Sequence, residues 1–137
     1  MASAIGPKAE MMGVVMKVFI CDESYKKSAN VMFSCVEGEI RLNTTDIVMI
    51  ETAGHKNIIQ LKDAKYQIYE TLENLGRQLK EYGFLRIHKS FLVNMAYIRS
   101  INNYILTLDD GRQFSVPKGR YKCVKQELAS YVGKNTD

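Results

Sequence analysis

The sequence predicts a mainly β fold with two short helices. Between residues 31 and 116, short runs of β-branched, aromatic and other apolar residues alternate with glycine, asparagine, aspartate or proline. Apolar residues recur at helical spacing in two stretches, 71–82 and 118–132. With 137 residues, 46% of them hydrophobic, the chain has the material for one ordinary domain with a core.

Five strand-like segments precede the first helix. They are apolar runs bounded by polar turns: 31–36, 40–42, 46–52, 58–61 and 66–69. Gly38 predicts the turn of a hairpin between the first two. The run from Ile47 to Ile50 is continuously apolar, which indicates a strand buried on both faces. A further short run, 17–21, is a candidate strand within residues 1–28, which we interpret as a leader or linker of uncertain origin.

The two helices have clear start, stop and core signals. Thr71 is the expected N-cap of the first helix, and Gly83 is expected to end it. Leu72, Leu75 and Leu79 fall on one face and are expected in the core. The second helix repeats this spacing with Tyr121, Val124, Leu128 and Tyr131.

Residues 84–94 combine strand-forming residues with several polar and charged ones. The pattern is too irregular for an amphipathic helix, and Lys89 and Ser90 mark an exposed corner between two strands. Residues 95–101 are expected as a strand with one wet face. Asn94 is expected to cap a turn through its side chain.

A last hairpin precedes the second helix. Residues 104–108 and 113–116 are its expected strands, and Pro117 ends the second of them. The pair Asp109 and Asp110 lies in the connecting turn, where aspartate is common for backbone reasons, so we do not interpret it as a metal site.

The sequence predicts a binding module and not an enzyme. It contains two histidines and no GxSxG, Walker-type or HExxH string, so no nucleophile, metal or cofactor site is expected. The three cysteines form no CxxC pair, which favours a reduced cytoplasm; Cys35 and Cys123 are expected to be small core fillers. No apolar run approaches the ~20 residues of a membrane span.

Positive charge is concentrated in the C-terminal part of the chain. Residues 1–83 hold ten Lys and Arg against eleven Asp and Glu, whereas residues 84–137 hold nine against four. A local positive field of this kind favours a polyanionic partner.

The string Phe-Leu-Arg-Ile-His-Lys-Ser-Phe-Leu-Val-Asn at 84–94, followed by Ile98, resembles the core of the LytTR DNA-binding domain, the output module of LytR/AlgR/AgrA-type response regulators. Thr45–Glu51, Tyr69–Leu75 and Leu108–Tyr121 resemble the family's opening strand, helix entry and last hairpin, in the same order. The resemblance implies a domain over 29–133 with a tail at 134–137. It also implies an elongated stack of small antiparallel sheets with about ten strands and two short helices.

The same resemblance implies a sequence-specific regulator of bacterial transcription that reads double-stranded DNA through loops. The base-reading candidates are His55, Lys56, Asn57, Lys118 and Arg120. The candidates for the DNA backbone are Arg86, Lys89, Ser90 and Lys122. His88 is instead expected to make a structural hydrogen bond. Gly119 lacks the long side chain that family members often carry there.

Because one module of this size reads few base pairs, two copies on a direct repeat spaced by ~10 bp are expected, with a homodimer on DNA as one arrangement. The alternative is a protein-interaction module that uses the basic loop edge to bind an acidic partner.

Overall fold

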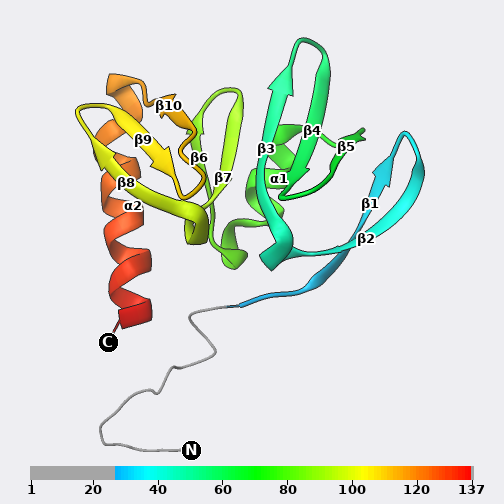
Figure 1. The fold of residues 1–137 in the computed structure, drawn as a ribbon, viewed down its shortest axis with the longest axis horizontal. Coiled ribbons are helices and arrows are strands. Elements are labelled where there is room, and N and C mark those ends of the chain that lie inside the picture. Colours follow the sequence, from blue (N-terminus) through cyan, green and yellow to red (C-terminus); the bar gives the residue numbers. More distant parts are fainter. Residues whose placement is uncertain (1–26, 137) are drawn as a thin grey trace, which may run out of the picture. The chain divides into compact units, whose positions relative to one another are not determined.

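A computed structural model describes residues 27–136, and within them ten strands form two antiparallel sheets (Figure 1). The larger sheet has seven strands in the order β2-β1-β5-β4-β3-β7-β6, and the smaller has three in the order β10-β9-β8. Two α-helices and three short 3-10 helices complete this part of the chain. The mainly β fold with antiparallel sheets and two helices is therefore confirmed. The expected strand at 17–21 lies outside the described residues.

The element boundaries lie within a few residues of those expected. The strands are β1 (Asn30–Cys35), β2 (Gly38–Asn43), β3 (Ile47–Ala53), β4 (Lys56–Leu61), β5 (Lys65–Ile68), β6 (Phe84–His88), β7 (Phe91–Asn94), β8 (Ile98–Asn102), β9 (Ile105–Leu108) and β10 (Gln113–Ser115). The helices are η2 (Thr44–Asp46), α1 (Leu72–Gln78), η3 (Lys80–Tyr82), η4 (Met95–Tyr97) and α2 (Lys118–Thr136).

Residues 28–127 form one compact unit, which holds both sheets, α1 and the beginning of α2. The remainder of α2 belongs to a second unit. None of the helices within residues 27–136 is long and apolar enough to cross a membrane.

Strand β3 is buried on both faces, as its continuous apolar run predicted. Ile47 and Ile50 enter a hydrophobic cluster with α1, and Val48 and Met49 enter a second cluster with β9 and α2. The register between β3 and β4 breaks between Ile47 and Met49. A β-bulge of this kind adds one residue and redirects side chains, which accounts for two consecutive residues in the same cluster.

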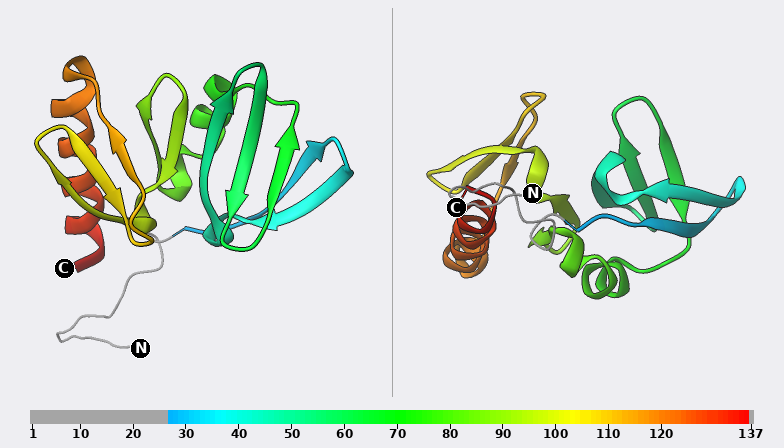
Figure 2. Two further views of the ribbon diagram at one scale, coloured as in Figure 1. Left: turned by 45° about the horizontal axis from the view of Figure 1, so that its top comes forward. Right: turned by 90° about the horizontal axis from the view of Figure 1, so that it is seen from below.

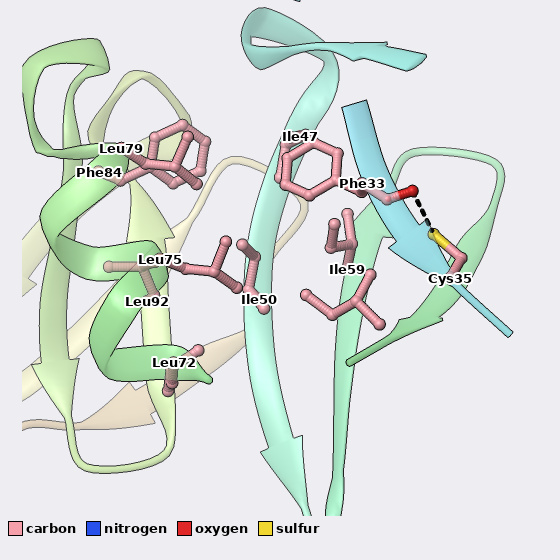
Figure 3. Packing of buried hydrophobic residues seen from close by; sticks show 11 residues of the cluster. Phe33, Cys35, Ile47, Ile50, Ile59, Leu72, Leu75, Leu79, Phe84 and Leu92 are labelled. Carbon is pink, nitrogen blue, oxygen red and sulfur yellow. Dashed lines mark hydrogen bonds between the residues drawn. The ribbon is translucent and has the colours of Figure 1, made fainter. Parts of the chain in front are cut away.

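Helix α1 covers one face of the seven-stranded sheet with the predicted leucine stripe. Leu72, Leu75 and Leu79 are all buried, and Figure 3 shows Leu75 directed toward Ile50 of β3. The Thr71 hydroxyl accepts a hydrogen bond from the Asn74 amide at 3.1 Å, so the predicted N-cap is confirmed.

The first helical stretch ends earlier than expected, because α1 gives way to the 3-10 helix η3. Gly83 then closes it with a left-handed backbone (φ +88°), as its position predicted.

The second hydrophobic cluster joins the three-stranded sheet and α2 to the other face of β3, β6 and β7. Its buried members are Val48, Met49, Ile87, Val93, Leu106, Leu108, Val116 and Val124. The prediction that Cys35 fills the core is confirmed, but the same prediction for Cys123 is wrong, since Cys123 is exposed. Tyr121 and Val124 share the inward face of α2, and position 123 lies about 100° around the helix from Val124.

Asn94 ties the end of β7 to the start of β3. It is only 4% exposed, its Oδ1 accepts from the Ala96 amide at 3.0 Å, and its Nδ2 donates to the Ile47 carbonyl at 3.0 Å. The predicted turn cap is confirmed. It also explains why Met95–Tyr97 is a 3-10 helix where a strand was expected, with β8 beginning only at Ile98.

Replacing Asn94 with aspartate should destabilise the protein by about 1–3 kcal/mol at neutral pH, because a carboxylate would face the carbonyl oxygens of Ile47 and Thr44. This burial should raise the pKa of the new carboxyl in the folded state. The loss should therefore be smallest below the unfolded pKa of about 3.9 and complete once the pH exceeds the raised folded value.

Urea unfolding of wild type and Asn94→Asp at several pH values measures this difference. Asn102→Asp on the exposed part of β8 is the matched control and should stay within about 0.5 kcal/mol of wild type. A loss at Asn94→Asp that does not change with pH would contradict the assignment.

Candidate nucleic-acid interface

Three loops carry all nine side chains that the sequence singled out for DNA contact. The first loop (54–57) joins β3 to β4, the second (86–90) joins β6 to β7, and the third (118–122) begins α2. In Figure 1 and in the left view of Figure 2, the turns of the first two loops and the start of α2 all lie along the upper edge. The fold of residues 28–127 thus brings the three loops to one side of this unit.

Direct contacts fix these loops relative to one another. The Thr52 amide, at the end of β3, donates to the Ser90 carbonyl at 2.9 Å and so joins the first loop to the second. The rings of His88 and Phe91 lie 5.2 Å apart, and Phe91 lies 4.8 Å from Phe114 of β10. Since β10 leads into α2, this chain of rings connects the second loop to the base of the third.

The first loop is shorter than expected, because β3 and β4 extend almost to its tip. His55 lies in the turn beside Gly54, whose φ of +66° suits glycine, and the side chains of His55 and Lys56 are exposed. Asn57 lies on β4, where its Oδ1 accepts from the Thr52 hydroxyl at 2.6 Å and its Nδ2 donates to the Glu70 carbonyl at 2.8 Å. Two of the three candidates therefore face solvent, while the third braces the loop.

Arg86 braces the second loop from within. Its Nε donates to the His88 carbonyl at 3.1 Å and its Nη2 donates to the Lys89 carbonyl at 2.5 Å. His88 Nδ1 accepts from the Ser90 amide at 3.1 Å, which confirms the expected structural hydrogen bond of His88. A bulge between Arg86 and His88 interrupts the pairing with β7 at this point. The backbone of the corner is held by its own side chains, and the Lys89 side chain is exposed.

Positive charges of the second and third loops act on each other. Burial lowers the pKa of Arg86, the positive charge of Arg120 lowers it further, and Glu73 partly opposes both. An anion bound nearby would therefore stabilise the charged form of Arg86.

The third loop is the first turn and a half of α2. Lys118 and Lys122 are exposed, Arg120 is partly buried, and the Arg120 amide donates to the Pro117 carbonyl at 2.9 Å. Proline is well suited to the start of a helix, and the positive end of the helix dipole adds to the three cations. A Cβ at Gly119 would meet nothing within 4 Å, so the missing side chain leaves open space.

One further contact, which packs against α2, was missed by the sequence-based expectations. Tyr104 was expected to begin a strand, but it lies in the turn between β8 and β9, and its ring packs 4.2 Å from the ring of Tyr121. The signal for a turn is the pair Asn102 and Asn103, since asparagine tolerates a left-handed backbone.

Known proteins are similar to this chain over the segment that contains the three loops. The family described as LytTr DNA-binding domain matches residues 37–129. The sensory transduction protein LytT of Bacillus subtilis is 32% identical over 98 residues, which cover 67% of this chain and 40% of that protein. The CO-sensing transcriptional regulator RcoM 2 of Paraburkholderia xenovorans is 31% identical over 98 residues, covering 68% of this chain and 37% of the relative. The chain thus spans about two fifths of the length of these relatives.

Among solved structures, a LytTr DNA-binding domain from Bacillus cereus has a similar fold. The two superpose with a TM-score of 0.63 at 20% sequence identity, over 72% of this chain and 95% of the other. The family match, the relatives and the two antiparallel sheets agree with the resemblance carried by residues 84–94. The chain belongs to the LytTr DNA-binding domain family.

Proposed function

We propose that this protein is a sequence-specific transcriptional regulator that grips double-stranded DNA with its three loops instead of a recognition helix. The observation that carries the proposal is the linkage of the loops: Thr52 bonds to Ser90, and Phe91 packs on Phe114, so that basic segments far apart in sequence reach one side together. Such a fixed set of donors suits the regular spacing of phosphates and base edges on a duplex.

Each loop has a separate role in this proposal. The outer two enter successive major grooves and the middle one crosses the minor groove between them. The base-reading residues are His55, Lys56, Lys118 and Arg120, and Asn57 supports the first of these loops. The phosphate-binding residues are Arg86, Lys89, Ser90 and Lys122. His55, Lys56 and Lys118 are exposed, so their side chains can reach a bound duplex.

We also propose that the domain is the output part of a bacterial signalling pathway and acts in the cytoplasm, where its DNA lies. The names of LytT and RcoM 2 describe sensory transduction and regulated transcription. No catalytic step belongs to this role.

Lys89→Ala should weaken binding by a similar factor for every DNA sequence, because a phosphate contact carries no base information. The slope of log affinity against log salt should become shallower by about 1. Fluorescence anisotropy at several salt concentrations measures both effects. Lys65→Ala, on β5 and outside the three loops, is the control and should leave the slope unchanged. A loss confined to one DNA sequence would contradict the phosphate assignment.

Arg86→Lys should lose nearly as much affinity as Arg86→Ala, roughly 10-fold, although lysine keeps the charge. Lysine cannot reproduce the planar pair of bonds from one guanidinium to the His88 and Lys89 carbonyls. Hydrogen exchange of the Ser90 amide should become faster in both variants. Lys89→Arg is the control and should bind like wild type. Full affinity in Arg86→Lys would mean that Arg86 acts by charge alone.

Two copies should bind a direct repeat spaced by ~10 bp more tightly than two isolated sites, because modules one helical turn apart lie on the same face of the duplex. Sites selected from a random DNA pool supply the half-site sequence. Affinities for single half-sites and for pairs at different spacings then test the arrangement. Equal affinity per module at every spacing would exclude it.

A further inference from the structure

The turn between β8 and β9 has an unusual residue at its second position. Its two central residues, Asn103 and Tyr104, have φ values of +51° and +66°. A two-residue turn with positive φ at both positions favours asparagine at the first and glycine at the second. Asn103 fits this pattern, but a bulky tyrosine at positive φ is an outlier. Glycine would form this turn with less backbone strain. The presence of tyrosine therefore indicates that its side chain makes a stabilising contact outside the turn.

Tyr104 contacts the chain on both sides of Lys118 and Arg120. Its carbonyl accepts from the Val116 amide at 2.8 Å, immediately before the start of α2. Its ring lies 4.2 Å from the ring of Tyr121, within α2. Lys125 Nζ lies 5.4 Å from the centre of the Tyr121 ring. Lys118 and Arg120 are the proposed base readers between these two contacts.

Filling of the core does not explain this arrangement. Tyr104 is 43% exposed, while Val116 and Val124 on either side of the third loop are almost completely buried. Val124 anchors α2 in the second hydrophobic cluster, and Tyr121, nearly one turn away, is only partly buried against the same cluster. The ring of Tyr104 packs on Tyr121 and so further restricts rotation of the helix about its axis.

We propose that Tyr104 is a positioning residue for DNA reading: its ring, packed on Tyr121, fixes the rotation of the first turns of α2 and thereby the direction of Lys118 and Arg120. This inference rests on the proposed function, since a base can be recognised only by a side chain held in a defined direction. Contacts to phosphates depend mainly on charge and tolerate small rotations.

The test compares wild type, Tyr104→Gly and Tyr104→Phe on two duplexes of equal length, one selected from a random pool and one of random sequence. In Tyr104→Gly the turn keeps a favoured residue, but affinity for the selected duplex should fall about 3- to 10-fold. Affinity for random DNA should change less than about 2-fold, so the ratio of the two affinities should fall. Tyr104→Phe keeps the ring and should restore the ratio.

The ratio separates positioning from loss of folding, because partial unfolding lowers both affinities by the same factor. Tyr121→Leu removes the other ring while keeping an apolar helix former, and it should lower the ratio as Tyr104→Gly does. It also serves as the test if Tyr104→Gly fails to fold. Tyr69→Gly, at another exposed tyrosine outside the three loops, is the matched control and should leave the ratio unchanged.

An unchanged ratio in Tyr104→Gly or Tyr121→Leu would overturn the inference, and so would a Tyr104→Phe variant that behaves like Tyr104→Gly. Wild-type protein that binds selected and random DNA equally would overturn the proposed function itself, and the positioning role with it. The two failures are distinguished by whether wild type discriminates.

Discussion

Strands β3 and β7 contribute residues to both hydrophobic clusters. Because both faces of these strands are buried, their charged residues and the candidate DNA-contact residues lie near strand ends. Ile50 and Leu92 enter the cluster under α1, whereas Met49 and Val93 enter the cluster with the smaller sheet. Neither face of these strands is open to water over its middle. An unpaired charge there would be strongly destabilising, so charged residues of this region occur where strands end. The first and second loops therefore carry candidate side chains because the strands that they connect are buried.

The bends keep their shape because nearby side chains satisfy their backbone groups. Arg86 donates to two carbonyls of the second loop, and His88 Nδ1 accepts from the Ser90 amide. In the first loop, Asn57 Oδ1 accepts from the Thr52 hydroxyl across the hairpin. Loops already ordered in the free protein lose less conformational entropy on binding. Arg86 is both a brace and a proposed phosphate contact, whereas the braces His88 and Asn57 are distinct from the exposed cations Lys56, Lys89 and Lys118. This lets the loops be stiff and still present positive charge to solvent.

Electrostatics alone would make this protein a weak and unselective binder. The net charge is only +4, and the N-terminal 83 residues contribute none of the excess. At physiological salt the Debye length is about 8 Å, so cations act on phosphates mainly at short range. In the proposed function, selective recognition depends on where each cation is held, and the braces of the second loop and the Tyr104–Tyr121 pair are the contacts proposed to hold them.

The sequence alone determined the features that arise within a few residues of one another. Hydrophobic periodicity located the strands and the leucine stripe, and side-chain chemistry identified the caps at Thr71 and Asn94 and the corner at Lys89. The order of four motifs identified the family, and with it the nine candidate contact residues, whose roles on DNA stay predictions.

Only the tertiary structure decided what those residues touch. It showed Cys123 at the surface, Asn57 and Arg86 engaged in bracing, and Tyr104 in a strained turn against Tyr121. The physical reason is range: caps and periodicity depend on neighbours along the chain, whereas Asn94 finds its carbonyl partner 47 residues away. Such partners are brought together by the burial of β3 and β7, and no local pattern encodes them.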